Sequence, residues 1–210
     1  MAPAVLVSPA LRRWKRLKSG LEWVETVLLL PFALPVIALA AMAIKLEDGG
    51  PVFHRRRVVG PGGEFDAFKL RTMRVDADQI LASNPALAAE FSKNFKLKDD
   101  PRVTRVGNYL RKKSVDELPQ LFNVLNGQMS LVGPRMVTPP ELDKYGAKQE
   151  IFRLVRPGLT GYWQVSGRQE VSYQERVEMD VFYVENWSLG FDYRILARTF
   201  WKVLTGEGAY

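Results

Sequence analysis

The sequence predicts a mostly helical α+β protein, in which a re-entrant membrane helix hairpin is joined to one small domain with interfacial amphipathic helices. Three observations lead to this fold class. Residues 26–44, TVLLLPFALPVIALAAMAI, contain no charged side chain. Short, turn-bounded segments of helical and extended pattern follow, without an internal repeat or a second domain boundary. The length of 210 residues and the hydrophobic content of 47% are enough for one buried core.

The uncharged segment has the length of a membrane helix. As a straight α-helix it would be about 28 Å long, close to the thickness of a bilayer's hydrocarbon core. Basic residues lie on both sides of it, within 12–18 and 55–57, so both flanks favour the cytoplasmic side. Pro31 and Pro35 each remove a backbone donor in the middle. A hairpin that enters one leaflet and returns accounts for these observations better than a straight span, a signal peptide or a buried helix of a soluble domain.

We therefore divide the chain into a basic N-terminal segment (1–18), a re-entrant membrane helix (19–47) and a cytoplasmic domain (48–210). The net charge of +7 indicates an anionic partner, which could be nucleic acid, an anionic lipid surface or a phosphorylated substrate. The chain contains no cysteine, which excludes a disulfide framework and thiolate metal sites.

The elements of the domain follow from turn and cap signals. Gly60-Pro61-Gly62-Gly63 is a strong turn signal between two short extended runs. Pro85 interrupts one helical segment, and Asn126-Gly127 ends another. We expect strands on both sides of 60–63, and helices at 76–95, 100–113, 118–125, 139–155, 172–186 and 190–204. An irregular loop is expected at 129–135 and a glycine-rich, non-helical connection at 156–168.

The last predicted helix has a basic stripe. Arg194, Arg198 and Lys202 recur every four residues, beside bulky residues such as Phe200 and Trp201. This pattern suits a helix that lies in a membrane interface. It also suits an ordinary surface helix that buries its apolar face, and the sequence does not decide between the two.

Two adjacent carboxylates, Asp116 and Glu117, occur in RKKSVDELPQ. Neighbouring helical side chains point about 100° apart, so the pair cannot share one proton as a carboxylate dyad does. In one interpretation Ser114 is an N-cap and Glu117 completes a capping box. Pro119 would then lie inside the helix, where it is unfavourable. In the other, Pro119 is the first helical residue and the pair lies just before a helix N-terminus.

This pair is suited to phosphoryl chemistry. Carboxylates beside the cations of 111–113 are expected to keep a low pKa and to stay ionised. An aspartate can attack a phosphoryl centre, and a neighbouring glutamate can hold Mg²⁺. Arginines in three loops, Arg135, Arg156 and Arg168, could bind a diphosphate. The only histidine, His54, is expected to be a surface residue rather than a base, and metal sites built from His or Cys are excluded.

Four segments together resemble the monotopic phosphoglycosyl transferases, also called the bacterial sugar transferase family. They are PVFHRRRVVGPGGEFDAFKLRTM, DPRVTRVGNYLRKKSVDELPQLFNVLNGQMSLVGPR, RPGLTGYWQVSGR and DVFYVENWSL. The resemblance extends from about Leu17 to the C-terminus. The terminal GEGAY and the segment GYWQVSGR are most similar to the branch that starts exopolysaccharide or O-antigen units with galactose 1-phosphate or glucose 1-phosphate.

The resemblance implies an enzyme that moves a sugar 1-phosphate from a UDP-sugar to undecaprenyl phosphate on the inner face of the cytoplasmic membrane and releases UMP. It implies that Asp116 is the nucleophile and that Glu117 binds an essential Mg²⁺. No nucleic-acid partner is then expected. The sugar and the oligomeric state, a homodimer included, stay open.

The resemblance also implies substrate contacts. Arg111 and Arg135 would bind phosphates, with Lys69 and Arg156 as further candidates. The membrane helix of the family breaks at a proline, commonly after a serine, and the aligned pair here is Leu34-Pro35. Two rivals are a membrane-bound nucleotidyl or phosphatidyl transferase and a non-catalytic, membrane-anchored basic scaffold that binds lipid or nucleic acid.

Overall fold

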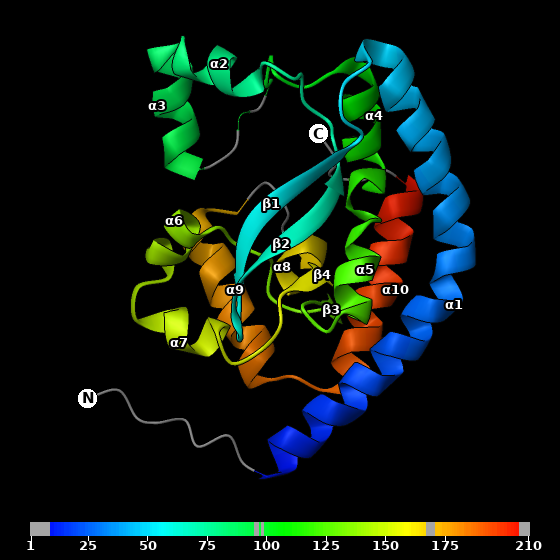
Figure 1. Cartoon of the computed structure of the whole chain (residues 1–210). Coiled ribbons are helices and arrows are strands. Elements are labelled where there is room, and N and C mark those ends of the chain that lie inside the picture. Colours follow the sequence, from blue (N-terminus) through cyan, green and yellow to red (C-terminus); the bar gives the residue numbers. More distant parts are fainter. Residues whose placement is uncertain (1–8, 95–96, 98, 167–170, 206–210) are drawn as a thin grey trace.

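The computed structural model describes residues 9–94, 97, 99–166 and 171–205. One long helix, α1 (Pro9–Asp48), runs along the side of the molecule, and short helices and two small sheets make up the rest (Figure 1). The shorter helices and 3₁₀ turns are α2 (Ala77–Ala82), α3 (Pro85–Asn94), α4 (Arg105–Lys112), η1 (Val115–Glu117), α5 (Gln120–Leu125), α6 (Pro139–Leu142), η2 (Asp143–Lys148), α7 (Gln149–Phe152), α8 (Tyr162–Ser166), α9 (Tyr173–Glu185) and α10 (Leu189–Thr205). The mostly helical α+β class is confirmed.

The two sheets are small and different in kind. Strands β1 (Phe53–Gly60) and β2 (Gly63–Leu70) form an antiparallel hairpin. Strands β3 (Ser130–Val132) and β4 (Gly158–Thr160) form a parallel pair. The hairpin was predicted around its glycine-rich turn, where Gly63 has a φ of +110° that favours glycine. Strand β3 lies in a segment predicted as an irregular loop, and that prediction is wrong, whereas β4 lies in the segment predicted only as non-helical.

The predicted helices are mostly confirmed. Helices α2 and α3 separate at Pro85 as expected, and α9 and α10 match the last two predicted helices closely. Helix α4 begins only at Arg105, where the Thr104 side chain accepts a hydrogen bond from Gly107 N. The predicted helix at 139–155 is broken into α6, η2 and α7, because Gly146 takes a non-helical conformation. Helix α8 lies within 156–168, so the prediction that this segment is non-helical is wrong there.

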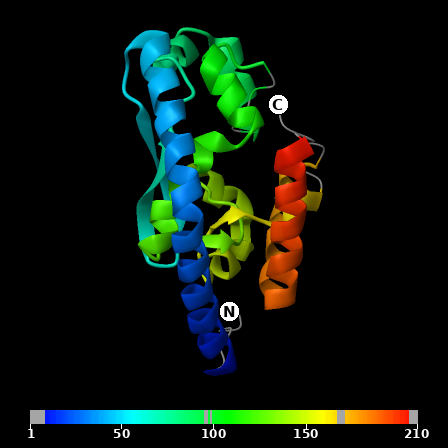
Figure 2. The same ribbon diagram turned by 90° about the vertical axis from the view of Figure 1, so that its right-hand side faces the viewer.

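Helix α1 bows around the domain as one continuous helix (Figure 1, Figure 2). Among the described helices it is the one that is long and apolar enough to cross a membrane, over Lys15–Asp48. Pro31 and Pro35 lie inside it, and the helix continues through both. The loss of two backbone donors does not end the helix here. The structure therefore does not confirm the predicted hairpin at these prolines.

Both ends of α1 are nevertheless bonded to the same domain. Near the N-terminal end, Lys18 Nζ lies 2.5 Å from Asp192 Oδ2 of α10 and donates to Val132 O of β3 at 2.9 Å. At the other end, Asp48 forms a two-oxygen ion pair with the buried Arg71. The Lys18–Asp192 pair is largely removed from water, whereas in the second pair Arg71 is buried and Asp48 is exposed. The residues on both sides of the uncharged segment 26–44 are therefore bonded to the same domain.

The two long helices α1 and α10 expose large apolar side chains. In α1 only a narrow face, including Ala33, Ile37 and Ile44, is buried against the domain. In α10, Ile195 is buried, whereas the basic residues Arg194 and Arg198 are exposed. The exposed apolar residues of the two helices include Leu28, Phe32, Leu39, Met42, Leu46, Phe200, Trp201 and Leu204. Helix α10 thus packs part of its apolar surface on the core, as the surface-helix alternative expects, and leaves the rest exposed, so the structure does not decide between the two alternatives.

A buried amide joins α5 to the hairpin. The side chain of Asn123 accepts a hydrogen bond from Phe68 N at 2.9 Å and donates to Asp66 O and to Gln128 Oε1, both at 2.8 Å. Asn123 has no exposed surface. It satisfies two backbone groups of β2 that point away from β1, so it holds the strand that carries Lys69 against α5.

Replacement of Asn123 by leucine should destabilise the fold, because it keeps a similar volume but leaves these buried polar groups without partners. We expect the free energy of unfolding to fall by about 3 kcal/mol. Urea unfolding of the detergent-solubilised protein, followed by circular dichroism, measures this loss. Asn126→Leu, at an exposed position at the end of the same helix, is the control. Equal stabilities for the two variants would contradict the role given to Asn123.

Candidate active site

The carboxylate pair lies in η1, a single 3₁₀ turn between α4 and α5. Ser114, just before it, has φ 54° and ψ 21°, a left-handed conformation that is uncommon for a residue other than glycine. The Ser114 side chain makes no capping hydrogen bond, so the capping-box interpretation is wrong. Pro119 is the residue directly before α5. This agrees to within one residue with the other interpretation, in which Pro119 is the first residue of the helix.

Lys69 of β2 bridges the two carboxylates. Its Nζ lies 3.3 Å from Asp116 Oδ2 and 2.9 Å from Glu117 Oε1. The Arg135 guanidinium reaches the same Glu117 oxygen, with Nη2 at 3.2 Å. Neighbouring side chains that diverge on an ideal helix thus meet at one ammonium group, and Glu117 has two cationic partners.

Burial and these cations move the two pKa values in opposite directions. Burial raises the pKa of Asp116, and Lys69 only partly opposes it, while the charge of Glu117 raises it further. Burial also acts to raise the pKa of Glu117, but Lys69 and Arg135 together outweigh it and lower the pKa. The expectation of a low pKa is therefore correct for Glu117 and wrong for Asp116. The cations that matter are distant in sequence, not those of 111–113.

Arg111 occupies a neighbouring position on the last turn of α4. Its Nε donates to Thr72 Oγ1 at 2.8 Å, and its side chain lines the same groove as the carboxylates. Arg111 makes no ion pair with a carboxylate among the described residues, so its charge is available to an anion in the groove.

Two glycines place Arg135. Gly133 N donates to Thr160 O at 3.0 Å, and Gly158 N donates to Pro134 O at 2.8 Å, which continues the β3–β4 pairing. A Cβ atom on Gly158 would lie 2.1 Å from Gly133 N. Only glycine allows the two backbones to come this close. Backbone hydrogen bonds thus hold the VGPR and RPG segments side by side. Arg135 is the residue directly after Pro134, so this pairing fixes its position.

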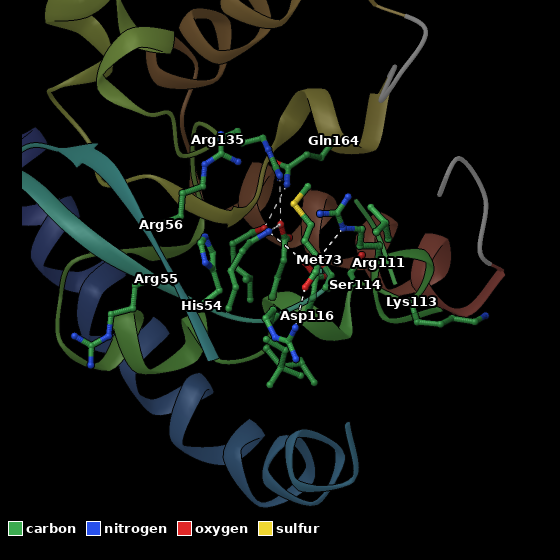
Figure 3. Close-up of a pocket in the computed structure, with 18 of the residues that line it drawn as sticks. His54, Arg55, Arg56, Met73, Arg111, Lys113, Ser114, Asp116, Arg135 and Gln164 are labelled. Carbon is green, nitrogen blue, oxygen red and sulfur yellow. Dashed lines mark hydrogen bonds and ion pairs between the residues drawn. The ribbon is translucent and has the colours of Figure 1, made fainter. Parts of the chain in front are cut away.

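The site lies in a large groove of about 2100 Å³. Figure 3 shows Arg135 and Gln164 on one side of it, across from Ser114, Asp116 and Arg111. Apolar side chains of α1 and α10 line another part of the groove, namely Leu28, Leu29, Phe32, Leu196, Phe200 and Val203. The groove therefore combines a charged end that holds both carboxylates with an apolar part between the two long helices.

The structure brings together most of the predicted site residues. Asp116, Glu117, Lys69, Arg111 and Arg135 all line the groove. In contrast, the Arg156 guanidinium donates to Ser19 Oγ of α1 and does not line it. Burial of that part of the chain against α1 places Arg156 apart from the other cations.

Two further predicted positions differ in outcome. His54 lines the groove and is an exposed residue, as expected for a surface position. Arg168, the third loop arginine, lies outside the described residues.

Sequence reasoning missed three residues of the groove wall. Arg56 of β1 forms an ion pair with Glu141 at 3.0 Å, and Arg176 of α9 lies over the ring of Trp163 at 4.7 Å. The HRRR run of β1 could have indicated Arg56, because alternate residues of a strand share a face and Arg56 therefore lies on the same face as His54. No sequence pattern around Arg176 or Trp163 indicates that these residues line the groove.

The donor set fits a hard divalent cation. No group of three or more His, Cys, Asp or Glu side chains that could hold a metal ion occurs within the described residues. Two adjacent carboxylates do converge on one cationic group, the ammonium of Lys69. Mg²⁺ is commonly bound by one or two carboxylates, with water and substrate phosphates as its other ligands. Asp116 and Glu117 therefore suit Mg²⁺ that arrives with a phosphorylated substrate.

Comparison with known proteins identifies the class. The model of the bacterial sugar transferase family matches residues 13–206. The chain belongs to the bacterial sugar transferase family.

Named relatives are similar over nearly the whole chain. The undecaprenyl-phosphate galactose phosphotransferase of Salmonella typhimurium is 43% identical over 96% of this chain and 43% of its own length. The exopolysaccharide production protein ExoY of Sinorhizobium fredii is 44% identical over 92% of this chain and 88% of its own length. The UDP-glucose:undecaprenyl-phosphate glucose-1-phosphate transferase of Caulobacter vibrioides is 41% identical over 92% of this chain and 72% of its own length. The chain thus spans less than half of the Salmonella protein.

Proposed function

We propose that this protein transfers a sugar 1-phosphate, of galactose or glucose, from a UDP-sugar to undecaprenyl phosphate and releases UMP. The observation that carries the proposal is the pair Asp116 and Glu117, which is buried in a groove with cationic side chains at one end and apolar helices at another. The names of the Salmonella and Caulobacter relatives support the sugar phosphate and the acceptor. The ExoY relative supports a role in exopolysaccharide synthesis.

The reaction would proceed in two displacements at one phosphorus atom. An Asp116 carboxylate oxygen attacks the phosphorus that carries the sugar, and the bond from this phosphorus to the oxygen bridging the two phosphates breaks. UMP leaves with that oxygen. A phosphate oxygen of the acceptor then attacks the same phosphorus, the bond to Asp116 breaks, and the carboxylate is restored. One difficult displacement becomes two easier ones.

The other side chains have distinct tasks in this scheme. Lys69 holds both carboxylates in place through its two contacts and offsets part of the cost of their burial. Arg111 and Arg135 would bind the diphosphate oxygens, because guanidinium groups match their geometry. Bound Mg²⁺, which Glu117 would hold, supplies positive charge against the phosphate oxygens.

We further propose that the protein is attached to the cytoplasmic membrane from one side, with the domain facing the cytoplasm. The support is that both ends of α1 are bonded to this domain, through Lys18 and Asp48, while apolar side chains between them are exposed. Ends that lie on one body do not suit a span with ends on opposite faces. Re-entry at Pro31 and Pro35 would require α1 to bend further than it does here.

Asp116→Asn should abolish turnover, because an amide oxygen does not form the phosphosugar ester. We expect UMP release to fall at least about a thousand-fold, with membrane association and helical content unchanged. A coupled UMP assay with UDP-galactose and UDP-glucose, each with undecaprenyl phosphate, measures this. Asp143→Asn, at an exposed position, is the control. Normal turnover in Asp116→Asn would remove the mechanism. Release of a product other than UMP by the unaltered protein would favour a different transferase class.

Removal of divalent cations should stop the reaction reversibly. We expect EDTA to abolish UMP release and excess Mg²⁺ to restore it. In Glu117→Gln the Mg²⁺ concentration for half-maximal rate should rise roughly tenfold or more, since one charged ligand is lost. Glu150→Gln, an exposed substitution, should behave like the unaltered protein. Full activity in EDTA would rule out this role for Mg²⁺.

A further inference from the structure

A second basic cluster lies in the groove on the Glu117 side of the site. It consists of Arg56, Arg135 and Arg176, which come from β1, the loop after β3, and α9. Trp163 joins two of them, because the Arg135 guanidinium carbon is 5.9 Å and that of Arg176 is 4.7 Å from its ring centroid. Cations stacked on an aromatic ring lose part of their hydration but keep their N–H donors at the edges.

Among the described residues, the three arginines have only two carboxylate partners. Arg56 pairs with Glu141 Oε2, an oxygen that also accepts bonds from Thr138 N at 2.8 Å and Thr138 Oγ1 at 2.9 Å. Arg135 pairs with Glu117. For Arg176, the described part of the chain provides no carboxylate within ion-pair distance, and its buried Nε has no hydrogen-bond acceptor.

A partly buried guanidinium without an acceptor is costly in a folded protein. Burial, and then the nearby charge of Arg135, act to lower the pKa of Arg176, which reflects the same cost. The cost is removed when an anion enters the groove and accepts the free N–H groups. Phosphate oxygens are well matched to such a fork of donors.

We propose that Arg176, with Arg56 and Arg135, binds the phosphate monoester of the lipid acceptor. This subsite rests on the proposed function and adds the residues that receive the second substrate. The nucleotide would bind on the Arg111 side, and Arg135 would contact the donor diphosphate in the first displacement and the acceptor phosphate in the second.

The surroundings of Trp163 favour the lipid phosphate over the nucleotide. Trp163 belongs to α8, which packs against α10. Thr160, just before α8, shares a hydrogen bond of 2.7 Å with Thr199 of α10. The apolar residues Leu196, Phe200 and Val203 of α10 line the groove. An isoprenoid chain could therefore lie along α10 while its phosphate reaches the arginines.

The subsite also suits the second displacement. The acceptor phosphate has to approach a phosphorus atom that already carries negative oxygens. Guanidinium groups that hold the acceptor's other oxygens reduce this repulsion. Loss of one of them should therefore affect the second half-reaction more than the first.

The two half-reactions can be measured separately. UMP release without acceptor reports attack by Asp116, and transfer of the labelled sugar phosphate to undecaprenyl phosphate reports the second step. For Arg176→Gln we expect kcat/KM for undecaprenyl phosphate to fall roughly 30-fold, mainly through KM, because a charged phosphate contact is lost. The first half-reaction should change by less than about threefold. Arg176→Lys should recover part of the loss, since it keeps the charge.

Two controls accompany these variants. Arg153→Gln removes an exposed arginine outside the groove and should leave both half-reactions unchanged. Farnesyl phosphate, a short soluble monoester, should inhibit the second half-reaction of the unaltered protein, whereas inorganic phosphate tests whether the lipid part is needed. In Arg176→Gln, farnesyl phosphate should inhibit roughly tenfold more weakly.

Several outcomes would overturn the inference. An equal loss in both half-reactions would assign Arg176 to the nucleotide phosphates or to the fold, and no loss in either would remove its role. A 30-fold loss in Arg176→Lys as well would show that the positive charge is not what matters. An unaltered protein that releases no UMP from any UDP-sugar would overturn the proposed function and this subsite together.

Discussion

The contact on which the rest of the site depends is the bridge from Lys69 to Asp116 and Glu117. Two adjacent carboxylates are buried together, and like charges so close are unfavourable unless cations approach both. One ammonium group from β2 meets this need for both side chains, and Arg135 adds a second cation to Glu117 alone. The two acids therefore differ: burial dominates at Asp116, and the cations dominate at Glu117. The two neighbouring carboxylates therefore stand in different electrostatic surroundings, which is consistent with the different tasks proposed for them.

The small elements of the fold serve to deliver these cations. Asn123 holds β2 against α5, which keeps Lys69 beside the carboxylate turn. The close approach of Gly133 and Gly158 fixes the start of the loop that carries Arg135. Neither device contributes much apolar burial. Both set the distance between charges, and the site would lose its arrangement if either moved. Helix α1, bonded to the domain at both ends, adds an apolar wall next to this charged end.

Much of the fold and the centre of the site could be predicted from the sequence, and the failures have physical causes. The hairpin, the paired carboxylates and Arg135 lie beside glycines and prolines, whose backbone preferences are local and readable. Strands β3 and β4 have three residues each, too few to show an alternating pattern, and the connection between them contains α6, η2 and α7. The pKa of Asp116 depends on burial, which neighbouring residues in the sequence do not reveal. Arg156 resembled a phosphate ligand by its motif, but it bonds to Ser19 of α1. Arg176 reaches the groove only because α9 packs beside Trp163.

The most direct test of this account is to identify the residue that carries the sugar phosphate during the reaction. The unaltered protein would be mixed with UDP-sugar and Mg²⁺ without acceptor, quenched in acid, digested and analysed by mass spectrometry. A phosphosugar adduct is expected on the peptide that contains Asp116, and it should disappear when undecaprenyl phosphate is added before the quench. An adduct on another residue, or none in a preparation that is turning over, would contradict it.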